Sequence, residues 1–142
     1  MAITAKYILL CDEVRQEING KFILLGVYMP DMTIPQIPFL VPSLTFFICL
    51  ESDRPGSFQM RFKLQHLESG AVIADGMGNI GFQQPGQGPV PVPLRNIGLV
   101  SAGAYVFSLT LEGQHEPITM SFNVVLTPQQ PQGFAPGFPL RR

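Results

Sequence analysis

The stretch that decides the fold class is residues 103–126, GAYVFSLTLEGQHEPITMSFNVVL. It holds two runs in which every second residue is apolar, separated by a turn near Gly113. The apolar residues of the first run are Tyr105, Phe107, Leu109 and Leu111, and those of the second are Ile118, Met120, Phe122, Val124 and Leu126. Because successive side chains of a strand point to opposite faces, each run predicts a strand with one buried face. The stretch therefore predicts an antiparallel hairpin.

A second hairpin is predicted near the N-terminus, at Asn19-Gly20. Both residues tolerate a positive φ, so this dipeptide suits a tight turn between strands at about 6–18 and 21–28. The segment 29–42 that follows contains four prolines. Since proline lacks the N–H that a ladder requires, this segment predicts a long crossover with at most one edge strand.

The middle of the chain continues the pattern of short strands. Residues 43–51 are apolar on both faces and predict a strand in the middle of a sheet, whereas 58–65 alternate and predict one solvated face. Ser69-Gly70 predicts a turn into a strand at 71–75, followed by a partly paired stretch at 77–83.

Residues 84–89, QPGQGP, predict a loop, and 90–100 predict the next strand. Pro91 and Pro93 confine the first half of that strand to a sheet edge. No stretch repeats apolar residues at helical spacing over three turns, so we expect no substantial helix.

Together these segments predict an all-β fold, an antiparallel β-sandwich of seven or eight strands, immunoglobulin-like or related. The 142 residues suit a single domain, which we place at 1–127. A Pro/Gln/Gly-rich C-terminal tail follows at 128–142.

Composition narrows the function classes. Charged residues make up 13% of the chain and the net charge is −1, so there is no basic field for nucleic acid or anionic lipid, and we expect neither partner. The apolar run at 7–10 ends at Asp12 and Glu13, too early for a signal peptide or a membrane span, which predicts a cytoplasmic protein. Cys11 and Cys49 lie inside predicted strands, so we expect buried free thiols, with a disulfide as the alternative.

Several segments carry a resemblance to a known family: LLCDEV at 9–14, NGKFILLGVY at 19–28 with the proline-rich crossover after it, and the final strand pair. Over roughly residues 7–126 the chain resembles an uncharacterised family of short bacterial β-sandwich proteins, a domain of unknown function. The resemblance implies the fold and a bacterial origin. It implies no catalytic or binding residue.

Candidate catalytic and metal-binding groups are few. Asp12 and Glu13 are neighbours on a strand and point to opposite faces, so they do not form a carboxylate pair. Asp31, Asp53 and Asp75 lie in or beside predicted loops and would bind a hard cation only if those loops met. Asp75-Gly76-Met77-Gly78-Asn79 lacks the strand-to-helix setting of a phosphate loop and predicts a bulge or tight turn.

His66 and His115 have no partner at nucleophile or zinc-ligand spacing. We therefore expect no cofactor and no catalytic residue, although a triad assembled in space is left open.

Charge is unevenly distributed along the chain. Arg95 is the only charged residue between Met77 and Leu111, and there is none between Pro117 and Leu140. Solvated strand faces usually carry charge, so we expect part of this half to be covered by the tail or by another subunit. The candidate interaction residues are Val106, Ser108, Thr110, Thr119, Ser121, Asn123, Phe134 and Phe138.

The leading hypothesis is a non-catalytic binding or assembly module that forms a homo-oligomer or binds a protein partner through this half. A carrier of small apolar ligands is the first alternative, with a pocket lined by Phe46, Phe62, Tyr105 and Phe122. A hydrolase or metal-dependent enzyme that uses His66, His115 or the loop aspartates is the second.

Overall fold

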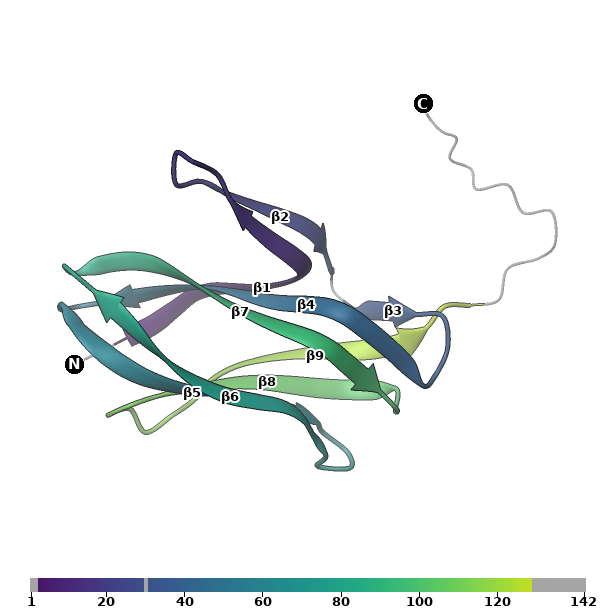
Figure 1. Cartoon of the computed structure of the whole chain (residues 1–142). Coiled ribbons are helices and arrows are strands. Elements are labelled where there is room, and N and C mark those ends of the chain that lie inside the picture. Colours follow the sequence, from purple (N-terminus) through teal and green to yellow (C-terminus); the bar gives the residue numbers. More distant parts are fainter. Residues whose placement is uncertain (1–2, 30, 129–142) are drawn as a thin grey trace.

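The computed structural model describes residues 3–29 and 31–128, which form nine strands and no helix (Figure 1). The strands are β1 (Ile3–Gln16), β2 (Phe22–Val27), β3 (Met32–Ile34), β4 (Phe39–Ser52), β5 (Gly56–His66), β6 (Val72–Phe82), β7 (Gly86–Leu99), β8 (Gly103–Leu111) and β9 (Ile118–Leu126). A four-stranded sheet has the order β2-β1-β4-β7, and a five-stranded sheet has the order β3-β9-β8-β5-β6. The described residues include no helix that could cross a membrane.

The all-β prediction is confirmed, but the strand count and the purely antiparallel pairing were wrong. The difference arises in the crossover, where Met32–Ile34 forms the short edge strand β3 and runs parallel to the end of β9. The remaining pairs are antiparallel. The crossover thus carries the chain from one sheet to the other and back.

The Asn19-Gly20 hairpin is confirmed. Gly20 has a φ of +88°, and the turn closes with a bond from the Glu17 N–H to the Lys21 carbonyl, at 2.7 Å. The first strand was misplaced by about three residues, since β1 begins at Ile3 and ends at Gln16. Figure 1 shows the β1–β2 hairpin rising from the four-stranded sheet, because β1 stops pairing with β4 after Cys11.

Strand β4 lies between β1 and β7, as its two apolar faces predicted, and β7 is an edge strand. The predicted loop at 84–89 was wrong in part, because β7 begins at Gly86 and pairs along β4 from its first residue. Pro91 and Pro93 lie opposite Phe47 and Thr45.

The Gly-x-Gly segment is not a turn but lies inside β6, in register with β5. A β-carbon on Gly76 would stand 2.6 Å from the Phe62 ring, and one on Gly78 would stand 3.4 Å from the Met60 methyl. These glycines therefore make room for two side chains of the neighbouring strand.

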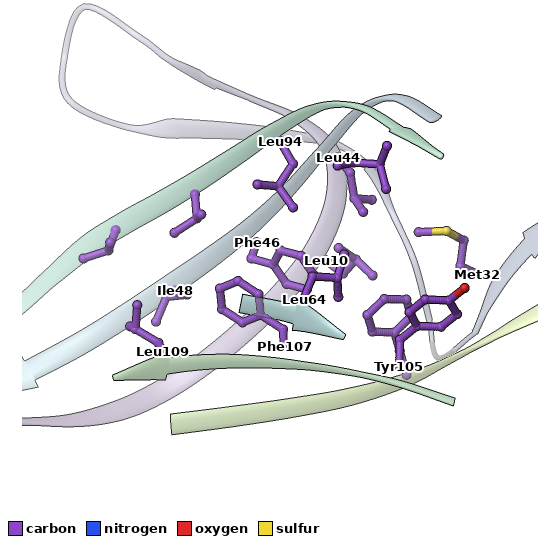
Figure 2. Close-up of a cluster of buried hydrophobic side chains, with 14 of the residues drawn as sticks. Leu10, Met32, Leu44, Phe46, Ile48, Leu64, Leu94, Tyr105, Phe107 and Leu109 are labelled. Carbon is purple, nitrogen blue, oxygen red and sulfur yellow. The ribbon is translucent and has the colours of Figure 1, made fainter. Parts of the chain in front are cut away.

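The core lies between the two sheets and is bridged by aromatic rings (Figure 2). Phe46 of β4 and Phe107 of β8 are fully buried and stack with centroids 4.0 Å apart and planes 12° apart. Tyr105 and Phe122 extend the cluster, with centroids 5.8 Å apart. Since Phe46 and Phe107 come from opposite sheets, their contact joins the sheets at the centre of the fold.

A polar clasp holds the base of the β1–β2 hairpin. The Tyr28 hydroxyl donates to Asp12 Oδ1 at 2.7 Å, and the Ser43 hydroxyl donates to the Asp12 carbonyl at 2.8 Å. Gly26 has a φ of +69°, and a β-carbon there would collide with the Asp12 carboxylate. Burial, followed by the hydrogen bond and charge of Asp12, raises the pKa of Tyr28 above its usual value near 10.

The first prediction concerns the joint between the sheets. Phe107→Ala should lower the free energy of unfolding by about 3–5 kcal/mol, because it leaves a cavity facing Phe46. The exposed Leu40, on β4 at the edge of the fold, provides the control, and Leu40→Ala should change stability by less than about 0.5 kcal/mol. Urea unfolding measures both, and equal losses in the two variants would contradict the central role of the ring contact.

The second prediction concerns the clasp. At neutral pH, Tyr28→Phe should cost about 1 kcal/mol through the lost hydrogen bond. Because the folded pKa of Tyr28 lies above the unfolded one, its contribution is complete below about pH 10 and is lost as the pH rises through the folded pKa. The stability gap between wild type and variant should therefore narrow above pH 10.

Urea unfolding at pH 7 and at pH 10.5 tests this. Tyr7 and Tyr105 also have raised pKa values, but they titrate in both proteins and cancel in the difference. The charge of Cys11 is itself one of the causes that raise the pKa of Tyr28, so its effect is part of the measured gap. A gap that stays constant or widens at alkaline pH would show that Tyr28 does not act in this way.

Candidate interaction face

The candidate residues of β8 and β9 share one face of the five-stranded sheet, the face turned away from the core. In the β8–β9 register Val106 lies opposite Ser121, and Ser108 lies opposite Thr119. Thr110, Thr119, Ser121 and Asn123 are exposed, while Val106 and Ser108 are half-buried. We call these six residues of β8 and β9 the outer β8–β9 face. Phe134 and Phe138 lie outside the described residues.

The outer β8–β9 face has no charged side chain of its own, but it is not isolated from charge. Strand β5 pairs with β8, which sets Arg61 opposite Thr110 and Lys63 opposite Ser108. On the far side of β5, Asp75 of β6 lies opposite Lys63. The C-terminal half carries few charges along the sequence, but in the structure it borders two basic residues. The reason is that β5 lies next to β8, which brings Arg61 beside Thr110.

An open depression of about 570 Å³ lies at this border. Its lining combines charged, hydroxyl and apolar groups. They come from β5, β6, β8 and the residue just before β9. The lining residues are Arg61, Phe62, Lys63, Asp75, Gly76, Met77, Ser108, Thr110 and Pro117.

The three loop aspartates do not come together. Asp31 precedes β3, Asp53 follows β4, and Asp75 lies within β6. Among the residues that the structure describes, no three His, Cys, Asp or Glu side chains are grouped as a metal site would require. Asp12 and Glu13 likewise serve separate partners, Tyr28 and Arg15.

His66 is buried and held by three hydrogen bonds. Its Nε2 lies 3.0 Å from the Ala102 carbonyl, which can only accept, so Nε2 carries the proton. Nδ1 then accepts from the Ser69 hydroxyl at 2.7 Å and from the Ser69 N–H at 3.3 Å. The ring thus ties the β5–β6 turn to the β7–β8 connection, and both nitrogens are occupied. His115 is exposed in the β8–β9 turn.

The residues predicted to line an apolar pocket pack on one another. Of the four residues predicted to line such a pocket, Phe46 lies 6.0 Å from Phe122 between ring centroids, and Phe62 lies 6.2 Å from Phe107. Phe46, Tyr105 and Phe122 are at most 4% exposed. These rings therefore form part of the packed core between the sheets.

Both cysteines are buried free thiols, as expected. They lie on neighbouring strands but out of register, since Cys11 is opposite Thr45 and Cys49 is opposite Tyr7. Burial is the first cause that raises the pKa of the Cys11 thiol, which makes it a poorer nucleophile.

One candidate surface was missed by the sequence reasoning. The β1–β2 hairpin exposes large apolar side chains: Ile23, Leu25 and Val27 are each 39% exposed, and Ile18 and Met29 are more so. The signal was present in the alternation of Ile23, Leu25 and Val27 at an uncharged strand. The distribution of charge along the chain does not reveal this surface, because it combines the residues of both strand faces.

Comparisons with known proteins show a similar fold and indicate no function. No curated protein matches the chain in sequence. Among solved structures, the alkylpurine DNA glycosylase AlkC of Pseudomonas fluorescens, bound to DNA with an abasic site analogue, aligns with a TM-score of 0.53 at 9% identity. A β-glucosidase of Listeria innocua in complex with glucose aligns with a TM-score of 0.49 at 9% identity.

Each alignment covers 87% of this chain, but only 30% of the glycosylase and 16% of the glucosidase. At this identity the glycosylase alignment shows a shared fold alone. The family comparison is different in kind, since a family model matches residues 6–125, which is most of the chain. The protein therefore belongs to DUF6941, a family of unknown function.

Proposed function

We propose that the protein is a non-catalytic assembly module, built on an immunoglobulin-like β-sandwich, that self-associates through the outer β8–β9 face. The observation that carries this proposal is the register of the two strands, which gathers six uncharged side chains on one continuous outer face. A sheet face of this kind can be covered without removing any of its own charges from water.

Desolvation energies support the choice of this face. Burying a hydroxyl or amide costs about 1–3 kcal/mol when it is left unpaired, and a charged group costs far more. Ser121, Thr119 and Asn123 can also regain hydrogen bonds from a matching face, because hydroxyl and amide groups both donate and accept. A second copy offers the same groups across a two-fold axis.

The exposed apolar residues of the β1–β2 hairpin favour a second contact surface. Ile23, Leu25 and Val27 alternate on the edge strand β2, which has neither proline nor a charged side chain within its bounds. Edge strands of this type tend to pair with other strands. The hairpin is therefore the competing surface that the experiment must separate from the outer β8–β9 face.

The test is the molar mass of the full chain by light scattering over a range of concentrations. We expect an oligomer for the wild type and a monomer for the double variant Thr119→Arg/Ser121→Arg, because two like charges would face each other across the two-fold axis. Both substituted residues are exposed, so the melting temperature should stay within a few degrees of wild type.

Two variants serve as controls. Gln83→Arg/Gln84→Arg adds the same charge in the exposed β6–β7 turn and should leave the oligomer intact. Ile23→Lys/Leu25→Lys should also leave it intact, and loss of the oligomer in this variant alone would assign the contact to the hairpin. A wild-type chain that is a strict monomer at every concentration would refute self-association.

A further inference from the structure

The basic side chains of the described residues fall into two groups. Four of them have acidic partners within 3.5 Å, in the pairs Lys6–Glu51, Arg15–Glu13, Lys21–Glu17 and Arg54–Asp53. Arg95 donates to the Ser43 hydroxyl at 3.2 Å. Within residues 3–29 and 31–128, Arg61 and Lys63 are the basic side chains that form neither an ion pair nor a hydrogen bond.

These two cations are placed together. Arg61 and Lys63 are two residues apart on β5 and therefore project from the same face, where both line the 570 Å³ depression. The strand register sets a hydroxyl opposite each one, Thr110 opposite Arg61 and Ser108 opposite Lys63. Two positive charges and two hydroxyl donors thus border one concave site.

The nearby carboxylates differ in their availability. Glu112 follows β8 and accepts the Gln59 N–H at 3.1 Å, which holds it at the end of the sheet. Asp75 lies opposite Lys63 on β6 and lines the depression, but the two form no ion pair. Asp75 therefore lowers the positive potential of the site without neutralising either cation.

The remaining lining is apolar. The thioether chain of Met77 and the ring of Pro117 border the depression beside the charged groups. Met77 is 56% exposed, so its apolar surface is open to a molecule in the depression. A guanidinium pairs with the planar oxygens of a carboxylate or the oxygens of a phosphate, and an ammonium supplies a second positive charge.

We propose that this depression binds a small organic anion, with its carboxylate or phosphate between Arg61 and Lys63 and its carbon skeleton against Met77 and Pro117. Ser108 and Thr110 donate hydrogen bonds to the same anionic group. Asp75 disfavours ligands with additional negative charge, so the site prefers one anionic group over several. The proposal goes beyond self-association. Ser108 and Thr110 also belong to the outer β8–β9 face, so the anion and a second copy of the chain compete for these two hydroxyl groups.

The experiment is a titration of the full chain, followed by backbone amide NMR shifts, with three probes: phenyl phosphate, phenylacetate and the neutral benzyl alcohol. We expect shifts confined to β5, β6 and β8 around residues 61–63, 75–77 and 108–110 with the two anions, and none there with the alcohol. The anion that binds more tightly shows whether the site prefers a phosphate or a carboxylate. Raising the salt concentration should weaken binding.

Three variants test the site by the direction in which each changes the affinity for the anion. Arg61→Gln/Lys63→Gln should weaken anion binding at least tenfold, whereas Asp75→Asn should strengthen it two- to fivefold. Lys6→Gln/Arg54→Gln removes the same amount of charge from paired cations elsewhere and should leave the dissociation constant unchanged. Melting curves confirm that each variant is folded, which is expected because all five side chains are exposed.

Three results would overturn the proposal: shifts spread over the whole surface, binding that the control pair weakens as much as the site pair, or weaker binding in Asp75→Asn. An absence of localised shifts with both anions at millimolar concentration would do so too. Localised shifts report anion binding and the molar mass reports self-association, so failure of this proposal is distinguishable from failure of the proposed self-association.

Discussion

The fold depends on the stacking of Phe46 on Phe107, which joins the two sheets at their central strands. Each ring sits on a strand that pairs on both sides, β4 with β1 and β7, and β8 with β5 and β9. A slip of one residue in β8 would turn Phe107 to solvent and bring Ser108 into the core. The same contact that joins the sheets therefore also sets which side chains of β8 face outward.

The two edge strands of the four-stranded sheet, β7 and β2, differ in how well they are protected from pairing with another strand. On β7, Pro89, Pro91 and Pro93 alternate with buried residues that pair with β4. A ladder along this part of the edge would lack three N–H donors, so the prolines disfavour pairing with another strand. The opposite edge, β2, has no such protection and is apolar. The four-stranded sheet is thus protected from strand pairing along the prolines of β7 and unprotected at β2.

Two polar side chains, those of His66 and Asp12, form hydrogen bonds that stabilise the fold. His66 uses both ring nitrogens to hold two connections together, and Asp12 receives the Tyr28 hydroxyl at the base of a hairpin. Arg61 and Lys63 differ, since they face solvent without partners in the described part of the chain.

The sequence by itself determined the all-β class, both hairpins, the central position of β4, the edge position of β7 and the shared face of the β8 and β9 residues. Each of these follows from alternation or from proline and glycine, which act over a few residues. Only the tertiary structure decided the parallel β3–β9 pair, the fit of Phe62 against Gly76 and the basic border beside Thr110. These join residues that are 14 to about 90 positions apart, and alternation does not encode which strand lies next to which.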